Sequence, residues 1–225
     1  MKPYKTAALT AVWRHMSCVD EHALEFISFP DKIIGHTLGY LDKNSVETIK
    51  QRTIIIDSVI KKLSPECVVE IGAGFSSRPK RFQGVKFYEM DLPYFKTRKN
   101  NMLLFDIERD KLGLKIKNGL FIVEGVTMYL HEDKVINLLR QIKKYKGHIL
   151  IDFFNEEYST KSKTLKEKLF KMIFKAFIGR SYLFDFRIKN ANQGKVILKK
   201  LGYKQIRHYK YNIPKTLDSL FYAEL

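Results

Sequence analysis

Short apolar runs alternate with helical patterns through the middle of the chain, and this alternation limits the fold more than any other feature. Runs of this length, rich in Val, Ile and Phe, are typical of strands buried on both faces of a parallel sheet. The five runs cover residues 67–71, 85–90, 101–106, 119–125 and 148–154. Residues 45–63 and 133–145 instead repeat apolar side chains at three and four positions, as amphipathic helices do. The sequence therefore predicts a doubly wound α/β sheet.

Size and composition predict one domain without a metal centre. The chain has 225 residues, 45% of them hydrophobic, which suffices for one full core. Cys18 and Cys67 stand too far apart to suggest a metal-binding pair, and the histidines lack metal-ligand spacing. Because no stretch approaches the roughly 20 apolar residues of a membrane span, we expect a soluble, cytoplasmic protein.

The positive charge is concentrated near the C-terminus. The whole chain carries +17, and residues 161–215 contribute 16 Lys and Arg against Glu167 and Asp185, which leaves +14 in that region. A basic face can attract RNA, an anionic membrane surface or an acidic substrate, but it can also be a solvated helix face. Aromatic residues that could stack on RNA bases are interleaved with these lysines. They are Phe170, Phe174, Tyr182, Phe184, Phe186, Tyr203, Tyr209 and Tyr211.

A glycine turn follows the first predicted strand, in VVEIGAGFSSRPKRF (68–82). Ligands of such sheets bind beyond the carboxyl ends of the strands, and glycines there let a ligand approach the backbone. The turn does not fit a phosphate-binding P-loop, because Ser77 and Arg78 stand where Gly and Lys are needed. Ser77 is also only a near match to the last small residue of the dinucleotide fingerprint. Asp91, at the end of the second strand, suits the ribose of any adenosine ligand, so these residues leave NAD and S-adenosylmethionine open.

Five ordered segments resemble the leucine carboxyl methyltransferase family, which includes bacterial O-methyltransferases of polyketide type. They are TAALTAVWRHMSC (6–18), QRTIIID (51–57), VVEIGAGFSSRPKRF (68–82), FYEMDLP (87–93) and FIVEGVTMYL (121–130). The resemblance implies S-adenosylmethionine as cofactor and the Rossmann-like class I methyltransferase fold. That fold is a mostly parallel, seven-stranded, doubly wound sheet with N-terminal helices and a helical insertion after the fifth strand.

The resemblance also implies the residues of a site. The implied cofactor-binding residues are Arg14, Arg52, Glu70, Gly72, Gly74, Asp91, Asp106, Ile107 and Glu124. Arg14 and Arg52 would lie near the methionyl carboxylate, and Glu124 would accept the methionyl ammonium. Asp91 would bind the ribose, with Asp106 and Ile107 beside the adenine. Tyr129 would lie in the active site as the candidate catalytic residue.

Simpler structural roles remain open for several of these residues. Arg14 and Arg52 could be surface charges on helices, Asp106 could cap a helix, and Tyr129 could be a packing residue. We expect the basic residues that follow the glycine turn, Arg78, Lys80 and Arg81, to form a solvated face.

The predicted organisation is a single methyltransferase domain, 1–225, in four parts. They are N-terminal helices (1–63), a cofactor-binding core (64–154), a basic helical lid or insertion (155–200) and C-terminal strands (201–225). Within the insertion, residues 164–177 carry an apolar stripe of Leu165, Leu169, Ile173 and Phe177. This helix could be a lid over the pocket, a membrane-surface helix or a packing element.

The matched motifs contain no convincing general base. A carboxylate acceptor is ionised at neutral pH and needs none, so the sequence favours O-methylation of a carboxylate or acidic hydroxyl on a small molecule. Two alternatives remain: an RNA (tRNA) methyltransferase that uses the basic C-terminal region, and a non-catalytic cofactor-binding or interaction module.

Overall fold

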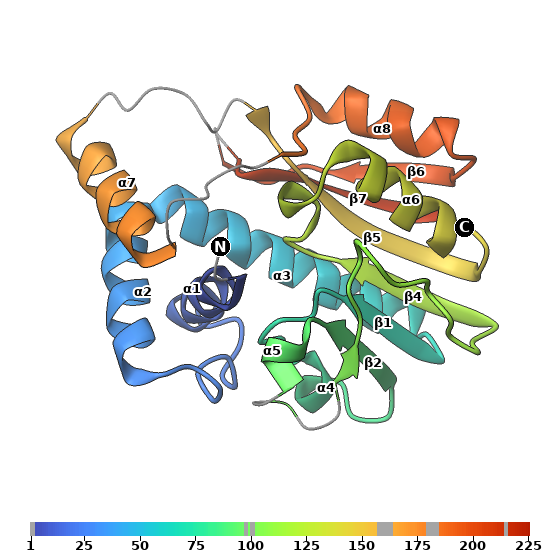
Figure 1. The fold of residues 1–225 in the computed structure, drawn as a ribbon, viewed down its shortest axis with the longest axis horizontal. Helices are drawn as coiled ribbons and strands as arrows, with labels where there is room; N and C mark the ends of the chain where they lie inside the picture. Colours follow the sequence, from blue (N-terminus) through green and yellow to red (C-terminus); the bar gives the residue numbers. More distant parts are fainter. Residues whose placement is uncertain (1–2, 97–98, 100–101, 157–163, 179–184, 214–215) are drawn as a thin grey trace.

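The sheet of the protein has seven strands in the order β3-β2-β1-β4-β5-β7-β6 (Figure 1). A computed structural model describes residues 3–96, 99, 102–156, 164–178, 185–213 and 216–225. The strands are β1 (Cys67–Ile71), β2 (Lys86–Asp91), β3 (Leu103–Leu104), β4 (Asn118–Val123), β5 (Lys146–Phe154), β6 (Lys204–Tyr209) and β7 (Asp218–Glu224). The first five are parallel, and β7 is antiparallel to both β5 and β6. The predicted doubly wound, mostly parallel sheet is therefore confirmed.

Helices cover both faces of this sheet. They are α1 (Pro3–Met16), α2 (Phe29–Leu41), α3 (Lys43–Leu63), α4 (Arg78–Arg81), α5 (Pro93–Lys96), α6 (Glu132–Ile142), α7 (Leu165–Ile178) and α8 (Ala191–Lys200). A 3-10 turn, η1, spans Thr127–Tyr129. On one face α3 packs against Val68, whereas α6 and α8 pack on the other face with Val69. Consecutive residues of a strand point to opposite faces, so one apolar run serves two helical layers.

The helix α3 carries residues that later contribute to the site. Its N-terminus is capped by the Asp42 side chain, which accepts a hydrogen bond from the Ser45 amide at 3.1 Å. The helix ends at Ser64, which adopts the left-handed conformation with φ of 42°. Its apolar face, including the fully buried Ile56 and Ile60, contacts the sheet.

The first two helices, α1 and α2, lie beside the sheet, whereas α3 packs on it (Figure 1). Figure 1 shows α1, α2 and α7 together at one end of the molecule, and α7 contacts both α1 and α2. The basic segment 155–200 contains a second described helix, α8, which packs against β6 and β7 at the other end. The two helices of this segment therefore lie in different parts of the fold.

Two expectations about packing are corrected by the structure. The run predicted over 101–106 gives a strand of only Leu103–Leu104, and both residues are exposed, because β3 is an edge strand; residue 101 lies outside the described residues. On α7, Leu165 is 83% exposed and Leu169 is 40% exposed, so they are not part of the packing stripe. Ile173 and Phe177 of the predicted stripe do pack, and Phe170 and Phe174 pack beside them.

No helix in the described ranges has both the length and the apolar character needed to cross a bilayer.

Two isoleucines on α3 test the packing of this layer. Replacing Ile56, which is fully buried against the sheet, by Ala should lower the free energy of unfolding by about 2–5 kcal/mol, because a cavity is left. The matched control is Ile54→Ala, at a position 48% exposed on the same helix, which should cost less than about 0.5 kcal/mol. Urea unfolding of both variants measures the difference. Equal losses would contradict the assignment of the buried face.

Candidate functional site

A cavity of about 670 Å³ opens at the carboxyl ends of the parallel strands. Its walls come from α1, α3 and α7 and from the segments that follow β1, β2, β3 and β4. The structure brings all ten sequence-predicted site residues to this one cavity. They are Arg14, Arg52, Glu70, Gly72, Gly74, Asp91, Asp106, Ile107, Glu124 and Tyr129. Their individual roles stay predictions.

The glycine turn after β1 is tied to the end of β2. The Gly72 amide donates to the Met90 carbonyl at 2.8 Å, and the Gly74 amide donates to Asp91 Oδ2 at 2.7 Å. Both glycines have positive φ, 72° and 51°, which favours glycine. A Cβ at Gly72 would also collide with the Val126 side chain. The backbone of this turn therefore needs glycine at positions 72 and 74 to keep its conformation beside the cavity.

Asp91 is held in place by the backbone around it. Its second carboxylate oxygen accepts the Leu92 amide at 2.7 Å, and the residue is only 9% exposed. Burial raises the pKa of Asp91, and the two backbone hydrogen bonds, from Gly74 and Leu92, oppose that rise. Each carboxylate oxygen keeps a further lone pair for a ligand, so Asp91 can accept two more hydrogen bonds from the cavity.

Asp106 and Ile107 lie at the cavity beyond β3. The Asp106 carboxylate accepts the Glu108 amide at 3.0 Å, and residues 107–109 form a turn. The alternative that Asp106 caps a helix is wrong, because a turn follows it.

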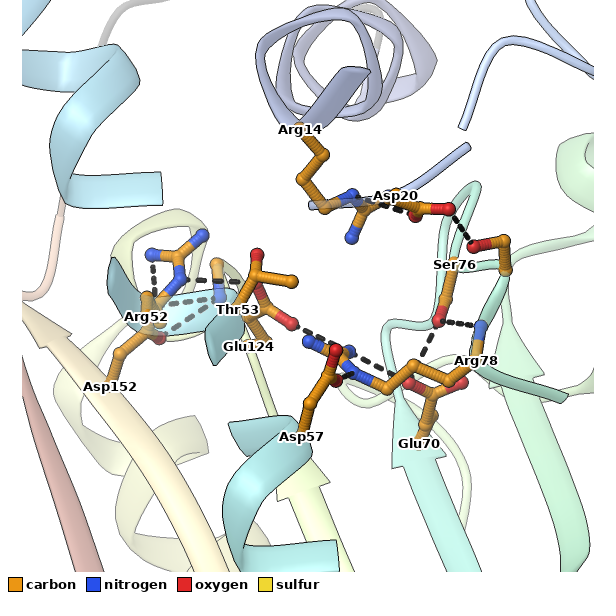
Figure 2. Close-up of polar contacts among 12 residues, drawn as sticks. Arg14, Asp20, Arg52, Thr53, Asp57, Glu70, Ser76, Arg78, Glu124 and Asp152 are labelled. Carbon is orange, nitrogen blue, oxygen red and sulfur yellow. Dashed lines mark hydrogen bonds and ion pairs between the residues drawn. The ribbon is translucent and has the colours of Figure 1, made fainter. Parts of the chain in front are cut away.

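Glu124 connects two buried arginines at the end of β4 (Figure 2). One oxygen accepts Arg52 Nε at 3.0 Å and the other is 2.8 Å from Arg78 Nη1. Burial alone would raise the pKa of Glu124, but Arg78, Arg52 and Arg14 together hold it well below its ordinary value. The carboxylate is therefore ionised at neutral pH, and its side chain keeps 10% exposure on the cavity.

A second nitrogen of Arg52 contacts acids from β5 and β7. Arg52 Nη1 donates to Asp152 at 2.6 Å and also to Asp218. Burial raises the pKa of Asp152 to about 7, with Arg52 lowering it and Asp218 raising it. The Gly125 amide donates to both Asp152 oxygens at 2.9 Å, and the Tyr211 hydroxyl donates to Asp218 at 2.7 Å.

Arg78 corrects a sequence-based expectation. We expected it on a solvated face, but it is 1% exposed and lines the cavity. Its Nε donates to Asp57 at 3.1 Å and its Nη1 to Glu70 at 2.9 Å, in addition to the contact with Glu124. The signal that could have found it is Glu70, an acid inside the apolar run CVVEI (67–71), because a buried carboxylate requires a charged or hydrogen-bonding partner.

The other basic residues differ in burial. Arg14 is 4% exposed and donates to the Phe75 carbonyl at 3.0 Å, so neither Arg14 nor the buried Arg52 is a surface charge. The Lys80 side chain is 48% exposed, as expected of a solvated residue, whereas Arg81 is half-buried and pairs with Asp57.

Tyr129 lies in η1, directly after the Glu124 segment. Burial raises its pKa to about 12, while a hydrogen bond with the Thr6 side chain acts in the opposite direction. The phenol is therefore neutral at physiological pH. It can donate a hydrogen bond to an acceptor but is poorly suited to act as a base.

Comparison with known proteins extends the description of the fold. No family model matches the chain, and no curated protein matches it either. Among solved structures, a DUF574 family protein from Streptomyces avermitilis superposes with a TM-score of 0.61 at 8% identity, over 96% of each chain. The methyltransferase domain of bacterial CtHen1-CN superposes with a TM-score of 0.54 at 17% identity, over 79% of this chain and 100% of that one.

A third solved structure was determined with the cofactor. Human N-acetylserotonin methyltransferase in complex with S-adenosylmethionine superposes with a TM-score of 0.52 at 13% identity. The superposition covers 94% of this chain and 61% of the human enzyme. These likenesses show that the chain has the fold of class I methyltransferases.

Arg78 offers a direct test of the charge network. Arg78→Met should lower the free energy of unfolding by about 3–5 kcal/mol, because it leaves Glu70 and Glu124 without a shared cation. Lys80→Met, two residues along α4 and half exposed, should cost less than about 1 kcal/mol. Denaturant unfolding near pH 7 measures both variants. A small loss at Arg78 would mean that it lies in solvent.

Proposed function

We propose that the protein is an S-adenosylmethionine-dependent O-methyltransferase that acts on a carboxylate or an acidic hydroxyl of a small molecule. The observation that carries this proposal is the pair of carboxylates, Glu124 and Asp91, that border one cavity on either side of the glycine turn. The cofactor carries an ammonium at one end and ribose hydroxyls towards the other, and each carboxylate suits one of these groups.

The residues of the cavity fit such a cofactor. Glu124 is ionised and reaches the cavity surface, so it can accept hydrogen bonds from an ammonium group. The turn carries no side chain at Gly72 or Gly74, so a ligand can approach its backbone closely. Asp106 and Ile107 lie on the strand-end wall next to Asp91, where the adenine would follow the ribose.

The two arginines expected near the methionyl carboxylate take different roles in this proposal. Arg52 uses Nε and Nη1 on three carboxylates, so its role is to hold Glu124 in position. Arg14 donates to the Phe75 carbonyl, forms a 3.6 Å ion pair with Asp20 through Nε, and lines the cavity from α1. It is the guanidinium better placed to bind the methionyl carboxylate.

When bound, the cofactor would supply a sulfonium methyl group that is already activated for transfer. The residues of the cavity would then bind the acceptor, orient its oxygen and exclude water. Tyr129 is neutral and can donate a hydrogen bond to the acceptor. The apolar walls from α1 and α7, including Trp13 and Phe174, exclude water from this part of the cavity. An ionised acceptor oxygen needs no base, which agrees with the absence of a suitable base among the matched residues.

The alternative of an RNA-binding surface loses support from burial. Phe186, Tyr203 and Tyr211, three of the aromatic residues that could stack on bases, are buried in the core. Tyr182 and Phe184 lie outside the described residues. The non-catalytic alternative does not account for the part of the cavity lined by Trp13, Tyr129 and Phe174, which extends beyond the residues assigned to the cofactor.

Cofactor binding tests the proposal directly. S-adenosylhomocysteine, the demethylated cofactor, should bind in the micromolar range, and NAD and ATP should bind far more weakly. Asp91→Ala should weaken S-adenosylhomocysteine binding by at least about tenfold, because hydrogen bonds to a charged acceptor contribute about 1.5–3 kcal/mol each. Isothermal titration calorimetry measures all of these affinities.

The control is Glu66→Ala, which removes an exposed acid just before β1 and should leave the affinity unchanged. The melting temperature of the Asp91 variant, compared with that of the wild type, shows whether the variant is folded. Tight NAD binding without binding of S-adenosylhomocysteine would overturn the proposal.

A further inference from the structure

The side of the cavity formed by α7 differs chemically from the side formed by the strand ends. Phe170 and Phe174 line the cavity and stack on each other with ring centroids 5.1 Å apart. Lys171 and Lys175, the next residue in each case, also line it and are exposed to solvent. Residues four apart share one face of a helix. Helix α7 therefore presents the rings of Phe170 and Phe174 to the cavity next to the ammonium groups of Lys171 and Lys175.

The charged lining residues differ between the two sides. The described lining residues that are acidic all belong to β1 or to the segments at the ends of β2, β3 and β4. They are Glu70, Asp91, Asp106, Glu108 and Glu124. Among the described lining residues from α7 onwards, every charged one is basic: Lys171, Lys175 and Arg187. The strand-end side also contains Arg14, Arg52 and Arg78, each of which is paired with a carboxylate. The α7 side is therefore the one where cations are not interspersed with acidic lining residues, and a negatively charged ligand group is favoured there.

Apolar side chains also line the cavity, and those of Leu9, Trp13 and Ile49 pack with the α7 aromatic rings. Trp13 and Leu9 from α1, Ile49 from α3, and Met128 and Phe154 all line the cavity. Trp13 and Phe154 are almost fully buried, whereas the α7 lysines reach solvent, so the cavity passes from an apolar interior to a cationic mouth. A ligand that fills it must carry an apolar body and a charged end.

From this arrangement we propose that the acceptor is an amphipathic anion: its apolar body lies against Phe170, Phe174 and Trp13, and a negatively charged group is held by Lys171, Lys175 and Arg187. This inference rests on the proposed function and specifies its substrate class. The oxygen that takes the methyl group must reach the strand ends, so it belongs to a different part of the acceptor from the group held at α7. The three cations are then specificity-determining residues.

Two fluorescent probes of nearly identical shape separate charge from apolar contact. 8-Anilinonaphthalene-1-sulfonate is an amphipathic anion, and N-phenyl-1-naphthylamine is the same ring system without the sulfonate. The titrations use full-length protein with and without saturating S-adenosylhomocysteine. The Lys171→Glu/Lys175→Glu double variant should bind the sulfonate about tenfold or more weakly than the wild type and bind the neutral probe as well as before.

The matched control reverses two lysines of the same helix that do not line the cavity, Lys166→Glu/Lys168→Glu. It makes the same change in net charge, so it should alter sulfonate binding by less than about twofold if local contact dominates. An equal effect of both double variants, or an equal loss of the neutral probe, would overturn the proposal.

Calorimetry with S-adenosylhomocysteine on the same variants separates this proposal from the function on which it rests. Unchanged cofactor affinity with weakened sulfonate binding supports both. Preserved sulfonate selectivity in a protein that does not bind the cofactor supports the anion site and counts against the proposed methyl transfer. Normal cofactor binding with no selectivity between the two probes overturns the anion site alone.

Discussion

The contact of Glu124 with two arginines is the interaction on which the site depends. Ionised groups are costly to bury unless every charge is matched, and here the charges alternate through Asp57, Arg78, Glu124, Arg52 and then Asp152 with Asp218. The chain of contacts joins α3 to the residue that follows β4 and to Asp152 of β5 (Figure 2). Asp218, the first residue of β7, completes it. It therefore fixes the helix that carries both Arg52 and Asp57 against the edge of the sheet where the cavity opens.

The same network determines the electrostatics of the cavity. Because three arginines hold the pKa of Glu124 low, its carboxylate stays negatively charged at the cavity surface. A cation gains most from such a charge where water is scarce. The opposite end of the cavity, at α7, is basic instead. A cationic cofactor and an anionic acceptor would thus each find a complementary side, with apolar walls between them.

The site residues that directly follow a predicted strand could be identified from the sequence. The glycine turn, Asp91 and Glu124 each follow an apolar run, and parallel strands place their carboxyl ends at one edge of the sheet, so these residues had to come together. The Arg78 contacts could not be read in the same way. Its neighbours Lys80 and Arg81 make the segment look like a solvated basic face, and its burial depends on acids from three other elements.

Asp218 and α7 show the same limit. Asp218 meets Arg52, 166 residues earlier, because β7 inserts between β5 and β6 in antiparallel orientation, and nothing near residue 218 signals that partner. In α7, apolar residues occur on several sides of the helix, so the spacing alone does not identify the buried face. It predicted burial of Leu165 and Leu169, which are exposed, and missed Phe170 and Phe174, which pack beside Leu9 and Trp13 of α1.

A crystal structure of the protein with S-adenosylhomocysteine tests the central claim most directly. The amino group of the ligand should lie within hydrogen-bond distance of Glu124, about 2.7–3.2 Å, while Arg52 and Arg78 keep their contacts with that carboxylate. The ribose hydroxyls should face Asp91. A ligand bound outside this cavity, or one whose amino group points away from Glu124, would contradict the account.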